Sequence, residues 1–64
     1  MNNQLKRSRL REGISQQELA KAVGVTRQTI LAIEKGNRNP SLALAHLIAR
    51  EIKRPLEELF WLNP

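Results

Sequence analysis

The chain of 64 residues contains no cysteine and only one histidine, His46. Disulfide bonds and thiolate metal sites are therefore excluded, and we interpret His46 as a surface or interface residue rather than a metal ligand. A core of this size supplies only about 3–5 kcal/mol of stability, so small domains often depend on a covalent link or on a partner chain. Because no disulfide is available, we expect self-association to supply the additional stability.

Long apolar runs and catalytic clusters are also missing. The sequence has no run of about 18 apolar residues that would cross a membrane, and its first four residues begin no signal peptide. We therefore expect a soluble, cytoplasmic protein with no membrane partner. The sequence shows no paired acids at a spacing that suggests a cleft, no Ser/His/Asp set and no glycine-rich phosphate loop, and five short helices hardly form a concave pocket. We predict that the protein is not an enzyme and uses no cofactor or metal.

Positive charge is concentrated in the first two-thirds of the chain. Residues 1–40 hold eight Lys/Arg and three Glu, a net charge of +5, whereas residues 41–64 hold three of each and are neutral. A one-sided basic charge is typical of proteins that bind a polyanion such as nucleic acid. A basic surface that only keeps the protein soluble is the alternative. Membrane-surface binding is not favoured, since the basic residues do not lie opposite a long apolar face.

Glycine and proline divide the chain into short segments, none of which alternates with the period of a strand. We expect one all-α domain over residues 1–64. Ser15, Thr26 and Ser41 are typical N-caps, and Ser15 forms a capping box with Glu18. The five expected helices span about residues 3–12, 16–23, 27–35, 42–52 and 56–60. The fourth is apolar almost all round, which predicts a central place in the domain or in an interface.

The second and third expected helices are joined by Gly24 and Val25, and the small residue Ala20 lies in the middle of the second. A glycine at this point permits the tight turn that sets two helices at a large angle, and Ala20 lets them approach closely. This pattern predicts a helix-turn-helix, whose second helix enters the major groove of DNA. Other tight corners between helices share the pattern, so it does not decide the function alone.

The outward face of the third expected helix carries side chains suited to reading DNA. At 100° per residue, four residues fall within one arc of about 100° on the face opposite the apolar stripe: Arg27, Gln28, Leu31 and Lys35. Arg pairs with guanine and Gln with adenine in the major groove, while an apolar group contacts the thymine methyl. We predict base contacts by Arg27, Gln28 and Leu31; an ordinary solvated helix face is the alternative.

Residues beside this face are expected to hold the phosphate backbone. Gln16 and Thr26 lie at helix N-termini, where amides and side-chain donors bind phosphate. Capping alone is the alternative for Thr26, and turn formation is the alternative for the asparagines of the loop after the third helix. The predicted backbone-contacting residues are Gln16, Thr26, Lys35, Asn37, Arg38 and Asn39. Glu34 is displaced from the base-facing arc toward the first helix, so we expect a structural ion pair between Arg9 and Glu34.

The C-terminal tail places five large apolar side chains within seven residues. A short helix turns only part of them inward, and an exposed patch of this size marks an interface. We predict a homodimer with two-fold symmetry, to which Leu44 or Leu47 adds contacts. The predicted dimer interface is Leu56, Leu59, Phe60, Trp61 and Leu62. A protein-interaction module of the antitoxin type, which sequesters a partner protein through the same apolar residues, is the alternative function.

Several segments carry a family resemblance when taken together. They are Ser15–Ala20, Val23–Ile30, Ile33–Gly36, Asn39–Leu42 and Pro55–Phe60. In these segments the chain resembles the Cro/repressor-type (XRE) helix-turn-helix family, and most of all its short single-domain members such as the cytolysin repressor. The resemblance implies a five-helix transcriptional repressor that binds a palindromic operator in double-stranded DNA as a homodimer, with its third helix in the major groove.

The resemblance also implies roles for single residues. It places base contacts at Arg27, Gln28 and the Leu31 and Ala32 positions, and backbone contacts at Gln16, Arg38 and Asn39. It supports the pair between Arg9 and Glu34. It further implies a small antiparallel ribbon between residues 2–4 and 60–62.

The sequence departs from the family pattern at three positions. Ser8 lies where the first helix usually buries a leucine, so Leu5 and Leu10 are expected to anchor that helix. Lys53 replaces the glycine or asparagine that usually adopts a left-handed conformation after the fourth helix, at a cost of about 1 kcal/mol. Leu47 lies where a charged residue is common, which indicates an added apolar contact.

Overall fold

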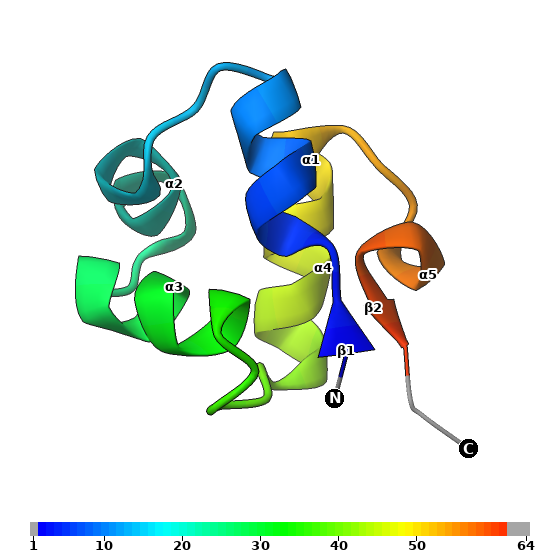
Figure 1. Cartoon of the computed structure of the whole chain (residues 1–64). Helices are drawn as coiled ribbons and strands as arrows, with labels where there is room; N and C mark the ends of the chain where they lie inside the picture. The colour runs from blue at the N-terminus through cyan, green and yellow to red at the C-terminus, as the bar shows by residue number, and fades with distance from the viewer. Residues whose placement is uncertain (1, 62–64) are drawn as a thin grey trace.

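The structure, a computed structural model, describes residues 2–61, which form five helices and a two-stranded ribbon (Figure 1). The helices are α1 (Leu5–Arg11), α2 (Gln16–Val23), α3 (Arg27–Glu34), α4 (Leu42–Ile52) and α5 (Leu56–Leu59). The strands are β1 (Asn2–Asn3) and β2 (Phe60–Trp61). The expected all-α class is confirmed, with α4 at the centre of the helices (Figure 1).

Local hydrogen bonds explain where α2, α3 and α4 begin. Ser15, Thr26 and Ser41 are the N-caps, and each side-chain oxygen accepts a hydrogen bond from the backbone amide three residues later. In the capping box, the Ser15 hydroxyl accepts from the Glu18 amide at 3.0 Å, and the Glu18 carboxylate accepts from the Ser15 amide at 2.9 Å. The predicted caps are therefore confirmed. Pro55, which directly precedes the expected fifth helix, is the N-cap of α5.

The strands β1 and β2 pair antiparallel and join the two ends of the described chain, as the resemblance implied (Figure 1). The amide of Gln4 extends this pairing by donating to the carbonyl of Leu59 at 2.9 Å. Asn3 is therefore a strand residue, and α1 begins later than predicted. Leu62, which was expected in the ribbon, lies outside the described residues. The paired residues are Asn2 with Trp61 and Asn3 with Phe60.

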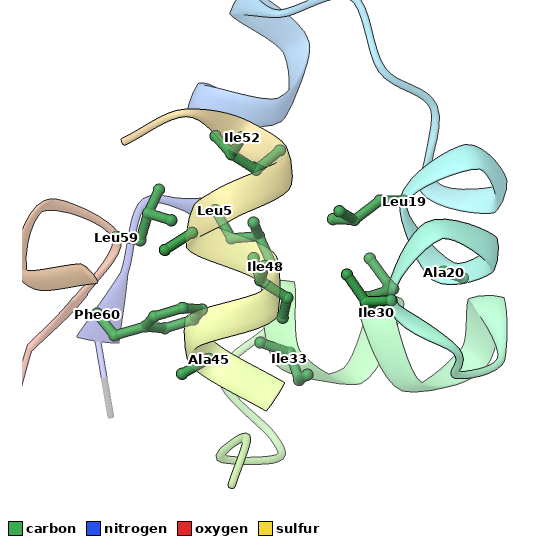
Figure 2. Packing of buried hydrophobic residues seen from close by; sticks show 12 residues of the cluster. Leu5, Leu19, Ala20, Ile30, Ile33, Ala45, Ile48, Ile52, Leu59 and Phe60 are labelled. Carbon is green, nitrogen blue, oxygen red and sulfur yellow. The ribbon is translucent and has the colours of Figure 1, made fainter. Parts of the chain in front are cut away.

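The core lies between α4 and the elements packed around it (Figure 2). Every element except β1 contributes an apolar side chain to it, and Ile14 and Val25 pack against it from the loops. The fully buried large side chains are Leu5, Leu19, Ile30, Ile33, Ile48, Ile52 and Leu59. This core fixes the relative positions of α2 and α3, which together carry the candidate site.

Two expectations about apolar side chains are wrong. Leu10 is 59% exposed, because it lies on the side of α1 away from the buried Leu5 and Ser8. Leu59 and Phe60 were expected in an exposed tail, yet they are 0% and 7% exposed within the single chain. The ribbon folds β2 back so that both side chains lie against α4 (Figure 2).

Candidate nucleic-acid interface

A tight turn at Gly24 and Val25 joins α2 to α3, which pack against each other. Gly24 ends α2 with a φ of 80°, and the Val25 amide donates to the carbonyl of Ala20 at 2.9 Å. A Cβ atom built on Gly24 would meet no atom within 4 Å. Glycine therefore suits this position because of its left-handed backbone, and not because another segment approaches it closely.

The start of α3 presents Arg27 and Gln28 to solvent, as the sequence predicted. Leu31 and Ala32 lie about one turn further along and are half-buried, so Leu31 is less exposed than expected. The opposite side of α3 is apolar and enters the core. The four predicted base-contacting residues therefore lie together on the part of α3 that faces away from the core.

Every exposed charged side chain between α2 and α4 is positive. Glu34, the only acid between Gly24 and Pro40, has a side chain only 3% exposed and paired with Arg9. The exposed charged residues are Arg27, Lys35 and Arg38. A phosphate backbone laid along this surface would meet three cations and no uncompensated carboxylate.

The remaining predicted phosphate-binding residues lie on either side of α3. Asn37, Arg38 and Asn39 are exposed on the loop that follows α3. Thr26 is exposed at its start, where its hydroxyl accepts from the Thr29 amide at 3.2 Å. The capping function weighed for Thr26 is thus present, while phosphate contacts by these four residues stay predictions.

A chain of hydrogen bonds runs from α1 to the start of α3. The Arg9 Nε donates to Glu34 Oε2 at 2.6 Å, and the Gln16 Nε2 donates to Glu34 Oε1 at 2.9 Å. The Arg27 Nε donates in turn to Gln16 Oε1 at 3.4 Å. Arg9 also donates through Nη1 to the carbonyl of Ile14 at 2.7 Å. The structural pair expected between Arg9 and Glu34 is present, and its side chains are 7% and 3% exposed.

The sequence did not predict that Gln16 takes part in this series of hydrogen bonds. The sequence predicted only a phosphate contact for this residue, whereas its half-buried side chain bridges Glu34 and Arg27. The three residues come from α2 and from the two ends of α3, so no spacing along the sequence indicates that they meet. The amide nitrogen of Gln16 carries a second hydrogen, which keeps the predicted phosphate contact chemically feasible.

Among residues 2–61, no three His, Asp or Glu side chains lie close enough to hold a metal ion. None of the five helices described is long and apolar enough to cross a membrane.

A family model for the helix-turn-helix (HTH_3) matches residues 5–59, which include all five helices. The chain belongs to the XRE-type helix-turn-helix family. It is 50% identical to the uncharacterized HTH-type transcriptional regulator YgzD of Bacillus subtilis, over 98% of this chain and 96% of that protein. A similarly named regulator of Methanothermobacter thermautotrophicus is also 50% identical, over 98% and 93% of the two chains. The protein is thus a transcriptional regulator with a helix-turn-helix DNA-binding domain, and regulators of this family are not enzymes.

Solved structures of helix-turn-helix regulators have the same fold. The restriction-modification controller protein C.AhdI of Aeromonas hydrophila superposes with a TM-score of 0.80 at 34% identity, covering 88% of this chain and 85% of that one. The clp gene regulator ClgR of Corynebacterium glutamicum superposes with a TM-score of 0.79 at 23% identity, covering 83% of this chain and 56% of that one. At this lower identity the ClgR match supports the fold alone.

Proposed function

We propose that this helix-turn-helix regulator is a repressor that binds a palindromic operator as a homodimer. The observation that carries the proposal is the exposed start of α3, where Arg27 and Gln28 face solvent in a stretch whose exposed charges are all positive. Such a regulator represses by occupying its operator, which requires no contact with the transcription machinery.

In the proposed complex, α3 lies in the major groove and contacts the base edges. The guanidinium of Arg27 suits the two acceptors of guanine, and the amide of Gln28 suits the acceptor and donor of adenine. Leu31 and Ala32, further along the same face, contact thymine methyl groups. The phosphates on both sides are held by Gln16, Thr26, Lys35, Asn37, Arg38 and Asn39.

The proposed dimer interface lies on α4 and α5, on a part of the chain that carries no net charge. Residues 41–64 hold three basic and three acidic residues, so two copies do not repel each other strongly. Leu42 and Leu47 on α4 are 69% and 43% exposed, and Leu44 and Leu56 are half-buried. With Leu59 and Phe60 in the core, Leu44, Leu47 and Leu56 are the apolar side chains that we propose a second copy covers on both chains at once.

Selection of bound sequences from a random pool of duplex DNA tests the proposal. We expect an enriched palindrome whose half-sites are centred about 34 Å apart, one turn of the duplex. Selection of a single, unrepeated half-site would contradict the homodimer on DNA. Enrichment of no sequence would contradict specific base reading.

The exposed leucines of α4 also favour one alternative, an antitoxin-like module that sequesters a partner protein. Binding to a random duplex at 50 and 200 mM salt separates the two functions. Six to ten phosphate contacts make the affinity fall by about 10³–10⁵ between these concentrations. A protein whose task is to cover an apolar partner surface would show weak DNA binding at both salt concentrations.

A further inference from the structure

We infer that Asn3 is a positioning residue, which holds the carboxyl end of α3 and thereby sets the course of the loop that follows it. This loop, residues 35–39, is called the phosphate loop below. The inference rests on the proposed function, in which the phosphate loop holds the DNA backbone through Lys35, Asn37, Arg38 and Asn39. It assigns a contribution to DNA affinity to a residue of β1, which lies outside the helix-turn-helix.

A side-chain hydrogen bond ties β1 to the end of α3. The Asn3 Nδ2 donates to the carbonyl of Ile33 at 2.8 Å, across 30 positions of the sequence. The Asn3 Oδ1 accepts from the Leu5 amide at 3.2 Å. These two partners fix the direction of the Asn3 amide, because a reversed amide would place its oxygen against the Ile33 carbonyl and its NH₂ group against the Leu5 amide. The half-buried side chain therefore presents its donor to α3.

The Ile33 carbonyl belongs to the cap that ends α3. The last carbonyls of a helix have no partner within it, and here the Gly36 amide donates to Ile33 and the Asn37 amide to Ala32, both at 3.0 Å. These bonds, with Gly36 in the left-handed region at a φ of 77°, form a Schellman motif. The motif turns the chain out of the helix, so it determines where the phosphate loop begins. A carbonyl oxygen accepts two hydrogen bonds, and Asn3 supplies the second one to Ile33.

The phosphate loop is exposed along its whole length. Within residues 2–61, Asn3 is the only side chain that hydrogen-bonds to the backbone of residues 32–39. Asn3 is itself held in the ribbon by its pairing with Phe60, which is buried in the core. Ordering an exposed loop on binding weakens a complex. By holding the Schellman motif before DNA arrives, Asn3 reduces that loss.

Asn3→Leu tests the inference, because it keeps the shape of the side chain and removes both of its hydrogen bonds. Phosphate contacts do not depend on sequence, so the affinities for the operator and for a random duplex should fall by the same factor. We expect about threefold to fivefold, within the net value of one hydrogen bond. The ratio of affinities for two operators that differ at the base pair read by Arg27 should not change. Gln4→Leu, on the exposed neighbouring residue, is the matched control and should leave both affinities unchanged.

Asn3→Asp separates the two hydrogen bonds of the side chain. It keeps the acceptor for the Leu5 amide and removes the donor to Ile33. The added charge also repels DNA, so the control is Gln4→Glu, which adds the same charge at the neighbouring exposed residue. We expect Asn3→Asp to bind both duplexes more weakly than Gln4→Glu does. A loss of affinity in Asn3→Leu that Asn3→Asp does not show would assign the effect to the start of α1 and overturn the positioning role.

Amide hydrogen exchange measures the hold on α3 without DNA. In Asn3→Leu, exchange at Gly36 and Asn37 should become several-fold faster, because their Schellman bonds open more often. The Val25 amide, which donates to Ala20 in the other turn of the helix-turn-helix, should exchange as before. A general loss of stability would instead accelerate all three amides equally. That result, or unchanged exchange at Gly36 and Asn37, would overturn the positioning role and leave the proposed function intact.

Combination with Arg38→Ala shows whether Asn3 acts on DNA through the phosphate loop. The losses of affinity in Asn3→Leu and Arg38→Ala should not add, because the position of Arg38 no longer matters once its guanidinium is removed. Fully additive losses would overturn the positioning role and leave phosphate binding by Arg38 intact. Unchanged affinity in Arg38→Ala would overturn that phosphate contact, and the positioning role with it. Thermal unfolding of each variant shows that folded proteins are compared, and Asn3→Asp carries the test if Asn3→Leu is unfolded.

Discussion

Lys53 has a φ of 62°, the left-handed region that side chains with a Cβ atom rarely occupy. It ends α4 as Gly24 ends α2. We therefore expect glycine at position 53 to stabilise the fold and a larger residue at position 24 to destabilise it. Lys53→Gly should raise the free energy of unfolding by about 0.5–1 kcal/mol, and Gly24→Ala should lower it by about 1–2 kcal/mol.

Urea denaturation measures both changes. Lys21→Gly, the same exchange inside α2, is the control and should be destabilising by about 0.5–1 kcal/mol. A loss of stability in Lys53→Gly as large as in Lys21→Gly would show that the lysine side chain contributes more than its backbone conformation costs.

The two arginines Arg27 and Arg38 are expected to contribute to DNA binding in different ways. Arg27→Ala should weaken binding to the selected operator by about 1–3 kcal/mol and leave binding to random DNA nearly unchanged, because a base contact is lost. Arg38→Ala should weaken binding to both and lower the slope of log affinity against log salt by about one, because a phosphate contact is lost. Fluorescence anisotropy at several salt concentrations measures both effects. Equal losses on both DNAs in Arg27→Ala would contradict base reading.

Because of Glu18, the stability of the start of α2 depends on pH. Hydrogen bonds from the Ser15 amide and hydroxyl lower the pKa of Glu18 below its usual value of 4.5. A lowered pKa in the folded state means that the charged carboxylate stabilises the fold. This contribution is complete above about pH 4.5 and is lost as the pH falls through the lower pKa of the folded protein.

In Ser15→Ala, the pKa of Glu18 should therefore rise toward 4.5. An NMR titration of the Glu18 carboxyl carbon measures the shift. Thr26→Ala removes the cap of α3 without touching Glu18, so it should leave this titration unchanged. An unmoved pKa in Ser15→Ala would mean that the capping box does not persist in solution.

At the scale of elements, the pair of Arg9 and Glu34 ties α1 to the end of α3. Both side chains are almost fully buried, so removing one partner leaves an uncompensated charge in the interior. Arg9→Ala should lower the free energy of unfolding by about 3–5 kcal/mol, a loss comparable with the whole stability of so small a core.

The double variant Arg9→Ala with Glu34→Ala should recover part of this loss, because no buried charge is then left alone. Thermal unfolding followed by circular dichroism measures the series. Arg7→Ala, on the exposed side of α1, is the control and should change stability by less than about 0.5 kcal/mol. A melting temperature in Arg9→Ala equal to that of the control would contradict a buried pair in solution.

Elements whose ends depend on local chemistry could be predicted from the sequence. The caps at Ser15, Thr26 and Ser41 accept hydrogen bonds within three residues of themselves, so the starts of α2, α3 and α4 required no knowledge of the tertiary structure. The predictions that were wrong concern residues whose burial depends on contacts between segments that are distant in the sequence. Leu10 was assigned to the core because Ser8 left α1 short of apolar residues, whereas burial of Ser8 itself completes that face.

In the candidate site, too, the features set by the local sequence were predicted, and those set by contacts between distant segments were not. The exposure of Arg27 and Gln28 followed from the helical period of α3 alone. The bridge formed by Gln16 depends on the angle between α2 and α3, which the sequence does not specify residue by residue. For the same reason Phe60 was placed in an exposed tail, since only pairing of β2 with β1 turns its side chain into the core.

For the whole molecule, the prediction concerns its oligomeric state. We predict a dimer in solution without DNA, held by Leu44, Leu47 and Leu56. Leu47→Glu should give monomers that bind the palindrome far more weakly, because a charge would be buried in the proposed interface. Sedimentation at tens of micromolar protein measures the oligomeric state. A wild-type monomer under these conditions would contradict the interface.

The control for this experiment is Leu10→Glu, which changes an exposed leucine on α1, outside the proposed interface. This variant should remain a dimer with unchanged affinity for the operator. Phe60 is unsuited to the test, since its burial in the core means that a charge there would unfold the chain before it revealed anything about assembly.

The ribbon between β1 and β2 also determines when the protein can fold during its synthesis. The first described residues are held in place by residues near the end of the described chain, since Gln4 donates to Leu59 and Asn3 pairs with Phe60. A nascent chain that ends before Leu59 leaves α1 without this anchor and Leu5 without part of its cover. The helix-turn-helix is translated early, but the core that supports it closes only when residues 59–61 have left the ribosome. We therefore expect this domain to fold only after residues 59–61 have been translated, and chains that end before Leu59 to bind DNA weakly.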